Sequence, residues 1–211
     1  MNTWLDYFDK QYKDKLTPRI SGVKRGLHEG IGVRYPGMRL AFELLLKNPK
    51  PWYNIVETGT LRKPGNWKDG QSSIIFTDFV CQHGGTVRSV DIDADACDRA
   101  RHAIKQDRFK VTAGDSVKYL QKLSNKDQVD LWYLDSYDVD WQNDTPSAQH
   151  HLNEWYAIQH HLAPGAVIVI DDNARMLHNN RRTGKGRLIV EELQQRGHPI
   201  LHDQYQIVFQ A

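Results

Sequence analysis

The sequence predicts an α/β protein built on a doubly wound, mostly parallel sheet. From residue 53 onward, apolar runs of strand length alternate with segments of helical periodicity, the pattern of a parallel sheet covered by helices on both faces. The last two apolar runs are separated only by Asp203 and Gln204, which predicts a hairpin and therefore an antiparallel final strand. The 211 residues are enough for one such domain with additions.

The elements are expected in a regular order along the chain. Strands are predicted at residues 54–57, 86–91, 109–113, 129–135 and 166–170. Helices are predicted between and after them, at residues 72–82, 94–106, 116–123, 148–162 and 187–196. The last helix ends at Gly197 with Pro199 just beyond, which is a helix stop signal. The strands of the hairpin follow at residues 199–202 and 205–210.

Residues 1–50 are predicted to form a separate helical extension, and residues 51–211 the main domain. Aromatic residues recur at near-helical spacing from Trp4 to Phe8, and residues 38–47 have the firmest helical pattern of the extension. Such an aromatic stripe indicates packing against a neighbouring surface. The alternatives are a lid over the site or a contact in a homo-oligomer formed through these helices.

Charge and cysteine content narrow the class of protein. Lys and Arg number 28 against 26 for Asp and Glu, and this net charge of +2 gives no reason to expect nucleic acid or an anionic membrane as a partner. Cys81 and Cys97 have neither metal-ligand spacing nor the spacing of a disulfide framework. No apolar run is long enough to span a bilayer, and the first residues lack the pattern of an export signal, so a soluble cytoplasmic protein is expected.

Polar side chains follow two of the predicted strands. Asp135 ends the fourth strand, and Asp171, Asp172 and Asn173 follow the fifth. Because ligands bind beyond the carboxyl ends of parallel strands, these side chains are expected to form one site. Carboxylate and carbonyl oxygens are the ligands that Mg²⁺ prefers. The four residues therefore predict a site for Mg²⁺ or another divalent cation, the alternative being that each Asp caps the helix or turn after its strand.

The order of five strand–helix units closed by a terminal hairpin resembles that of class I S-adenosylmethionine-dependent methyltransferases, whose sheet is Rossmann-like. The segment Ile55-Val-Glu-Thr-Gly59 resembles their first motif, in which an acidic residue ends strand one and glycine lets the backbone approach the cofactor. Glu57 and Gly59 fill these places. The compact glycine motif of the family is interrupted here, because residues 60–70 intervene before the helix that begins near Ser72.

The resemblance implies S-adenosylmethionine as the cofactor and gives roles to the strand ends. Asp91, after the second strand, would accept hydrogen bonds from two ribose hydroxyls. Asp115 and Ser116 resemble the motif that contacts the adenine edge, with capping of its own helix as the alternative for Asp115. A nicotinamide dehydrogenase would also suit Asp91, but no Gly-x-Gly-x-x-Gly follows the first strand. The implied cofactor-contacting residues are Glu57, Gly59, Thr60, Ser73, Asp91, Asp115, Ser116 and Asp135.

The motifs Val-Glu-Thr-Gly, Leu-Asp-Ser-Tyr-Asp and Pro-Gly-Ala-Val-Ile-Val-Ile-Asp-Asp resemble those of metal-dependent O-methyltransferases. Asp135 and Asp172 match metal ligands in both the catechol branch and the macrolide and aminocoumarin sugar branch. Asn173 completes the pair of the catechol branch, whereas Asp171 completes that of the sugar branch. The catechol branch carries a general-base Lys three residues after its strand-four Asp, and Asp138 stands at that place here.

The resemblance implies in-line methyl transfer to a hydroxyl of a small polyhydroxylated, sugar or catechol-like acceptor. A cation bound by Asp135 and Asp172 would hold vicinal hydroxyls and lower the pKa of the attacking one. The catalytic candidates are Asp135 and, as general base, Asp138, His151 or Lys185. The basic segment 181–187 would favour an anionic or phosphorylated acceptor, or is a solvated loop. A metal-independent methyltransferase and a non-catalytic binding module of the same fold are the alternative functions.

Overall fold

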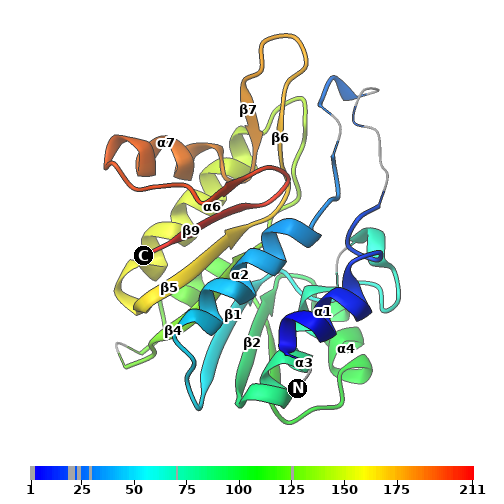
Figure 1. The fold of residues 1–211 in the computed structure, drawn as a ribbon. Helices are drawn as coiled ribbons and strands as arrows, with labels where there is room; N and C mark the ends of the chain where they lie inside the picture. Colours follow the sequence, from blue (N-terminus) through cyan, green and yellow to red (C-terminus); the bar gives the residue numbers. More distant parts are fainter. Residues whose placement is uncertain (1–2, 19–21, 23–24, 29, 70, 125) are drawn as a thin grey trace.

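The computed structural model describes residues 3–18, 22, 25–28, 30–69, 71–124 and 126–211. A seven-stranded sheet in this part of the chain forms the centre of the molecule (Figure 1), with the strand order β3-β2-β1-β4-β5-β9-β8. Strands β1 to β5 are parallel, and β9 pairs antiparallel with β5. The predicted α/β, doubly wound fold with an antiparallel hairpin strand is therefore confirmed.

The strands and helices lie close to the predicted ranges. The strands of the large sheet are β1 Tyr53–Thr58, β2 Gly85–Asp91, β3 Phe109–Ala113, β4 Val129–Leu134, β5 Leu162–Ile170, β8 His202–Asp203 and β9 Ile207–Gln210. The helices that connect them are η2 Trp67–Asp69, α3 Ser72–His83, α4 Ala94–Ala103, α5 Ser116–Leu120, α6 Thr145–Ile158, η3 Gln159–His161 and α7 Arg187–Gln195. Helix α6 begins three residues before its predicted start at residue 148, because Pro146 fits the first helical turn.

The two faces of the sheet bury different side chains. In β4, Leu131 and Tyr133 belong to the apolar cluster under α2 and α3, whereas Trp132 and Leu134 belong to the cluster under α6 and α7. This alternation follows from the period of two along a strand, and all four side chains are at most 1% exposed. A strand that is apolar throughout is typical of a parallel sheet covered on both faces (Figure 1).

The N-terminal segment contributes helices α1 Trp4–Tyr12 and α2 Tyr35–Lys47. Helix α1 starts with a capping box between Thr3 and Asp6, and the ring of Trp4 lies 5.1 Å from that of Phe42 and 5.2 Å from that of Phe79. These helices thus share one apolar cluster with the sheet. Residues 1, 2, 19–21, 23, 24 and 29 of the predicted extension lie outside the described residues. The lid and oligomer roles of the extension stay predictions.

A short hairpin, β6 Asn173–Arg175 and β7 Arg182–Gly184, occupies the predicted loop between residues 174 and 186. Strands of three residues are too short to show an alternating pattern, so the sequence does not reveal them. Gly184 has φ +108°, and a Cβ atom there would lie 2.2 Å from the carbonyl oxygen of Asp172. The hairpin therefore returns the chain directly against the end of β5. None of the helices in the described segments has the length and apolar character of a membrane span.

Candidate active site

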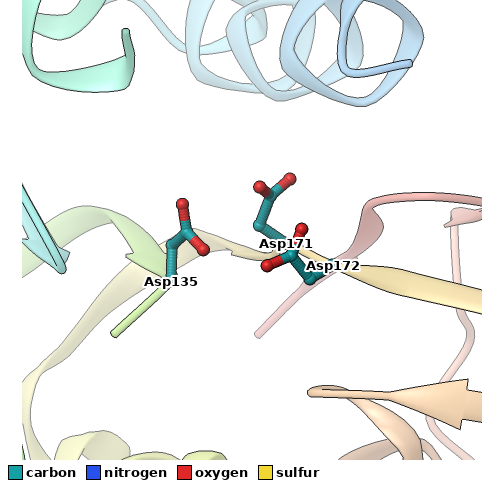
Figure 2. Close-up of side chains that lie close together, drawn as sticks. All are labelled: Asp135, Asp171 and Asp172. Carbon is teal, nitrogen blue, oxygen red and sulfur yellow. The ribbon is translucent and has the colours of Figure 1, made fainter. Parts of the chain in front are cut away.

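The ends of β4 and β5 bring three carboxylates together. Asp135 follows β4, Asp171 and Asp172 follow β5, and one oxygen atom of each lies within 4.8 Å of the others. Figure 2 shows the three side chains at neighbouring strand ends, with Asp171 and Asp172 on successive residues. Asp172 has a left-handed backbone with φ +53°, which is uncommon for a residue other than glycine. The structure thus gathers three of the four predicted oxygen ligands.

Two buried cations pair with these carboxylates. The Lys185 ammonium contacts Asp135 and lies 2.8 Å from the Oδ2 atom of Asp172. Arg34 donates from Nε to the Oδ2 atom of Asp171 at 2.7 Å, and its Nη2 atom lies 3.5 Å from Asp172. The side chains of Lys185 and Arg34 are 1% and 6% exposed. Each carboxylate therefore has a cationic partner within the protein.

The two residues directly before β9 supply neutral partners. The Tyr205 hydroxyl donates to Asp172, and the Gln206 amide nitrogen donates to the Oδ1 atom of Asp171 at 3.0 Å. The Arg34 guanidinium also lies over the Tyr205 ring, 5.0 Å from its centre. These contacts hold the pair of carboxylates after β5 from the side opposite to β4 in the strand order.

The three carboxyl groups have different pKa shifts. Burial raises the pKa of Asp135 to about 8, with Lys185 opposing the shift and the two other carboxylates adding to it. Burial also raises the pKa of Asp171, although Arg34 opposes it. For Asp172, burial alone would raise the pKa, but Lys185 and Arg34 outweigh it and hold the pKa below its ordinary value. Asp172 is therefore the carboxylate that stays ionised most firmly.

Lys185 does not suit its predicted role as a general base. Burial alone would lower the pKa of its ammonium, but Asp135 and Asp172 outweigh burial and raise the pKa above its ordinary value. A protonated amine has no lone pair with which to accept a proton from an acceptor hydroxyl. In this arrangement Lys185 is a fixed positive charge.

Asn173 is occupied by the backbone. Its amide nitrogen donates to the carbonyl oxygens of Ile170 at 2.9 Å and Asp171 at 3.0 Å, and its amide oxygen accepts the N–H of Gly186 at 2.7 Å. These bonds fasten the end of β5 to the start of α7. The structure thus gives Asn173 a structural role where the sequence predicts a metal ligand.

A cavity of about 400 Å³ lies beyond the carboxyl ends of β1, β2 and β4 and contains four of the predicted cofactor residues: Gly59, Thr60, Asp91 and Asp135. Gly59 has φ +82°, and a Cβ atom there would lie 2.4 Å from the carbonyl oxygen of Asp135, so glycine is required for this close approach. The cavity is of the size that small-molecule and cofactor sites have.

Asp91 faces this cavity with its carboxylate held in place. Its Oδ2 atom accepts the N–H of Thr60 at 3.0 Å and its Oδ1 atom accepts the N–H of Asp93 at 2.9 Å. Burial raises the pKa of Asp91, with these two hydrogen bonds opposing the shift. A carboxylate oriented in this way suits the predicted contact with ribose hydroxyls.

Glu57 and Ser73, which are predicted to contact the cofactor, do not line the cavity. Both are fully buried, and Glu57 accepts hydrogen bonds from the hydroxyls of Ser73 and, at 2.9 Å, Ser72. Burial raises the pKa of Glu57 to about 7, although the hydroxyl donors oppose the shift. Glu57 thus fastens the end of β1 to the first turn of α3 rather than presenting its carboxylate to the cavity.

Asp115 and Ser116 make structural contacts at the start of α5. The Asp115 side chain accepts the N–H of Lys118 at 2.9 Å and caps the helix. The Ser116 hydroxyl lies 2.9 Å from the Nε2 atom of His150. The capping alternative for Asp115 is therefore observed, and its contact with adenine stays a prediction.

Two further base candidates have partners outside the carboxylate cluster. Asp138 is exposed and pairs with Arg62, whose Nη1 atom lies 2.9 Å from its carboxylate. His151 is fully buried on α6 and donates from Nδ1 to the carbonyl oxygen of Ser147, 2.8 Å away. Burial lowers the pKa of His151 to about 4, although Glu154 opposes the shift, so its imidazole is neutral at pH 7.

Two arginines of segment 181–187, Arg182 and Arg187, are also paired. Arg182 contacts Asp203, to which Arg175 is bound at 2.8 Å, and Arg187 donates to Asp144 at 3.0 Å. A guanidinium that already binds a carboxylate is less available for a phosphate. The segment is also not a fully solvated loop, since the side chains of Arg182 and Arg187 are largely buried.

Comparison with known proteins decides the family. A family profile described as a methyltransferase domain matches residues 65–173, more than half of the 211-residue chain. The chain belongs to this family. The matched segment of the methyltransferase domain contains Asp91, Asp135, Asp171 and Asp172, and it begins after Gly59. The predicted class of protein is confirmed by this match. No curated protein sequence matches the chain.

Solved structures share the fold of this methyltransferase domain. SMU.1697c of Streptococcus mutans, in complex with S-adenosylhomocysteine, is 10% identical with a TM-score of 0.53, covering 82% of this chain and 96% of its own. The MycE methyltransferase from the mycinamycin biosynthetic pathway, in complex with Mg and S-adenosylhomocysteine, is 16% identical with a TM-score of 0.52, covering 82% of this chain and 47% of its own. The methyltransferase domain spans less than two thirds of the length of several similar structures, between 43% and 64%.

Proposed function

We propose that this methyltransferase domain uses S-adenosylmethionine to methylate a hydroxyl of a small polyhydroxylated, sugar or catechol-like acceptor. The observation that carries the proposal is the position of Asp135, which belongs both to the 400 Å³ cavity and to the carboxylate cluster. A cofactor in this cavity would thus lie beside the charged groups that could orient an acceptor. MycE, which shares the fold, forms a complex with S-adenosylhomocysteine, and this supports the choice of cofactor.

The proposed reaction is a direct displacement. The acceptor oxygen attacks the methyl carbon in line with the C–S bond, and the bonding electrons remain on sulfur, so the sulfonium becomes the neutral thioether S-adenosylhomocysteine. The acceptor proton passes to the ionised form of Asp135, which borders the cofactor cavity. The protein contributes mainly by holding the two reactants in line.

A second cavity, of about 350 Å³, is the proposed acceptor pocket. It is lined by apolar side chains, among them Ile31 and Val33, by Tyr205, and by polar or charged residues that include His28, Arg175 and Asp203. Tyr205 connects this cavity to the carboxylate cluster, because it lines the cavity and its hydroxyl donates to Asp172. A lining that mixes apolar with polar side chains suits a ring that carries hydroxyls.

The predicted divalent cation does not fit the site as it is arranged. Three carboxylate oxygens are suitable donors for Mg²⁺, but the Lys185 ammonium contacts two of the three carboxylates. A metal ion would have to displace this buried side chain. We therefore derive no step through a metal, and the metal-independent alternative is favoured by the position of Lys185.

Formation of S-adenosylhomocysteine tests the proposal. Purified protein with S-adenosylmethionine would be screened against sugars, nucleosides and catechols, and against the same compounds with single hydroxyls blocked as methyl ethers. Turnover that disappears when one hydroxyl is blocked would support O-methylation. Methylation of amines alone, or cofactor binding without turnover on any acceptor class, would contradict it and favour N-methylation or a non-catalytic module.

A further inference from the structure

We propose that Lys185, assisted by Arg34, fills the cation position of this site, so that the acceptor hydroxyl binds to a built-in ammonium and methyl transfer needs no divalent metal. This inference rests on the proposed function. The carboxylate pattern of the sequence predicts a divalent metal, whereas here Lys185 takes its place and contacts the acceptor.

The position of Lys185 is fixed by the chain on both sides of it. Its backbone N–H donates to the carbonyl oxygen of Asp172 at 3.2 Å. The preceding residue, Gly184, donates to Asp144 at 2.9 Å, and the following residue, Gly186, donates to Asn173 at 2.7 Å. With the side chain 1% exposed, the ammonium lies against the carboxylates because the backbone places it there.

The charges of the cluster also argue against an added cation. Three carboxylates face two buried cations, and Asp172 contacts both Lys185 and Arg34. A divalent ion bound to the same oxygens would lie beside two buried positive charges. Moving Lys185 away would leave its ammonium buried without a partner, which is costly. The protein therefore supplies its own cations for these oxygens.

The geometry indicates what Lys185 does for the acceptor. An ammonium has three N–H donors, and the contacts of Lys185 with Asp135 and Asp172 use two of them. The proposal assigns the third donor to an acceptor oxygen that binds beside Asp135, at the edge of the cofactor cavity. A positive charge at the attacking hydroxyl favours loss of its proton, as a metal ion does. A single N–H donor binds one oxygen, whereas a metal chelates a vicinal pair. The acceptor class therefore includes molecules with one isolated hydroxyl, and vicinal hydroxyls are not required.

The first arm of the test is Mn²⁺ binding, measured by electron paramagnetic resonance on the chelator-treated protein with and without S-adenosylhomocysteine. The wild type is expected to bind Mn²⁺ no more tightly than Asp172→Asn. The variant Lys185→Met is expected to gain a Mn²⁺ site, which the double variant Lys185→Met with Asp172→Asn loses again. Stoichiometric Mn²⁺ binding by the wild type that Asp172→Asn abolishes would overturn the inference.

The second arm is turnover. Wild-type activity is expected to be the same in chelator and in Mg²⁺, while Lys185→Met loses roughly 100-fold or more in kcat and keeps its affinity for S-adenosylhomocysteine within about threefold. The control Lys110→Met changes an exposed lysine on β3 and should alter neither. Activity that is lost in chelator and restored by Mg²⁺ would contradict the inference.

The two proposals fail in different ways. If the wild type does not bind S-adenosylhomocysteine, the proposed function fails, and the Mn²⁺ titration still decides whether the built-in cations exclude a metal. If Lys185→Met does not fold, the wild-type Mn²⁺ titration and the comparison of chelator with Mg²⁺ decide the inference without it.

Discussion

The carboxyl edge of the sheet has two halves, formed by the ends of β1 and β2 and by the ends of β4 and β5. The carboxylates of the two halves have different hydrogen-bond and charge partners. At the ends of β1 and β2, Glu57 and Asp91 accept hydrogen bonds from hydroxyls and backbone N–H groups. At the ends of β4 and β5, Asp135 and Asp172 are paired with the ammonium of Lys185. Of the two carboxylates with neutral donors, Asp91 faces the cofactor cavity and Glu57 is fully buried. We therefore propose that Asp91 binds the cofactor, and that Asp135 and Asp172 act in acceptor chemistry.

The largest effect on turnover should come from removing a charge at the ends of β4 and β5. Asp172→Asn removes the charge that partners Lys185 and Arg34, and turnover should fall by roughly 1,000-fold, as when a group that acts on the transition state is lost. The affinity for S-adenosylhomocysteine should change less than about threefold. Steady-state kinetics and calorimetry measure the two quantities, with the exposed Asp140→Asn as the matched control. Equal loss of cofactor affinity would contradict the division into halves.

Titration of Glu57, at the end of β1, should make the stability of the protein depend on pH. The pKa of Glu57 is about 7 in the folded protein, against an ordinary value of 4.5, because of burial. Between these pH values the folded state keeps a proton that the unfolded state has lost, so the free energy of unfolding falls as pH rises. The contribution of Glu57 should decrease by about 3 kcal/mol from pH 4 to pH 8.

The variant Glu57→Gln does not titrate and isolates this contribution. Urea unfolding of the wild type and Glu57→Gln at pH 5 and pH 8 should show the variant gaining stability relative to the wild type as the pH rises. A difference between the two proteins that is independent of pH would show that Glu57 is not buried as a carboxyl in the folded protein.

A smaller effect is expected for Asp91, because the ribose hydroxyls that it is proposed to bind carry no charge. Asp91→Asn keeps the shape of the side chain but loses the ability to accept from two hydroxyls with a full charge. The free energy of binding S-adenosylhomocysteine should weaken by about 2 kcal/mol, the range of a hydrogen bond to a charged group. Calorimetry with S-adenosylhomocysteine and with a 2′,3′-dideoxy analogue measures it. If the variant and the wild type lose the same affinity on removal of both hydroxyls, Asp91 is not the ribose ligand.

The smallest effect is expected at the exposed rim between the halves. Asp138 pairs with Arg62, and the two side chains are 74% and 42% exposed, so the pair contributes little. Asp138→Asn should change kcat by less than about threefold. A rate that falls by orders of magnitude, with a changed pH profile, would instead identify Asp138 as the general base.

Much of the fold follows from the sequence because apolar strands covered on both faces are long and uninterrupted. The carboxylates at the strand ends are also predictable, since parallel strands end at one edge. Their partners are not. Arg34 is separated from Asp171 by 137 positions, and Lys185 reaches the site through the hairpin of β6 and β7, whose strands have three residues each.

The structural contacts of Asn173 and Glu57 have a common physical cause. Sequence patterns identify Asn173 and Glu57 as polar groups at strand ends, but not whether backbone or hydroxyl donors already occupy them. In the structure Asn173 binds Gly186 and Glu57 binds Ser72 and Ser73. Glu57 and Asn173 are also buried, at 0% and 1% exposed, so their polar atoms face other parts of the protein. Local hydrogen bonding, which depends on three-dimensional contacts, therefore separates structural from ligand-binding polar residues.

The most direct test of the account is calorimetric titration of S-adenosylhomocysteine into chelator-treated wild type, Asp91→Asn and Asp172→Asn. The account predicts binding of one ligand per chain without metal, unchanged in Asp172→Asn and weakened in Asp91→Asn, because the cofactor lies at the half with neutral donors. Absence of binding by the wild type, or a loss in Asp172→Asn as large as that in Asp91→Asn, would contradict the assignment of cofactor binding and transfer chemistry to separate halves of the sheet edge.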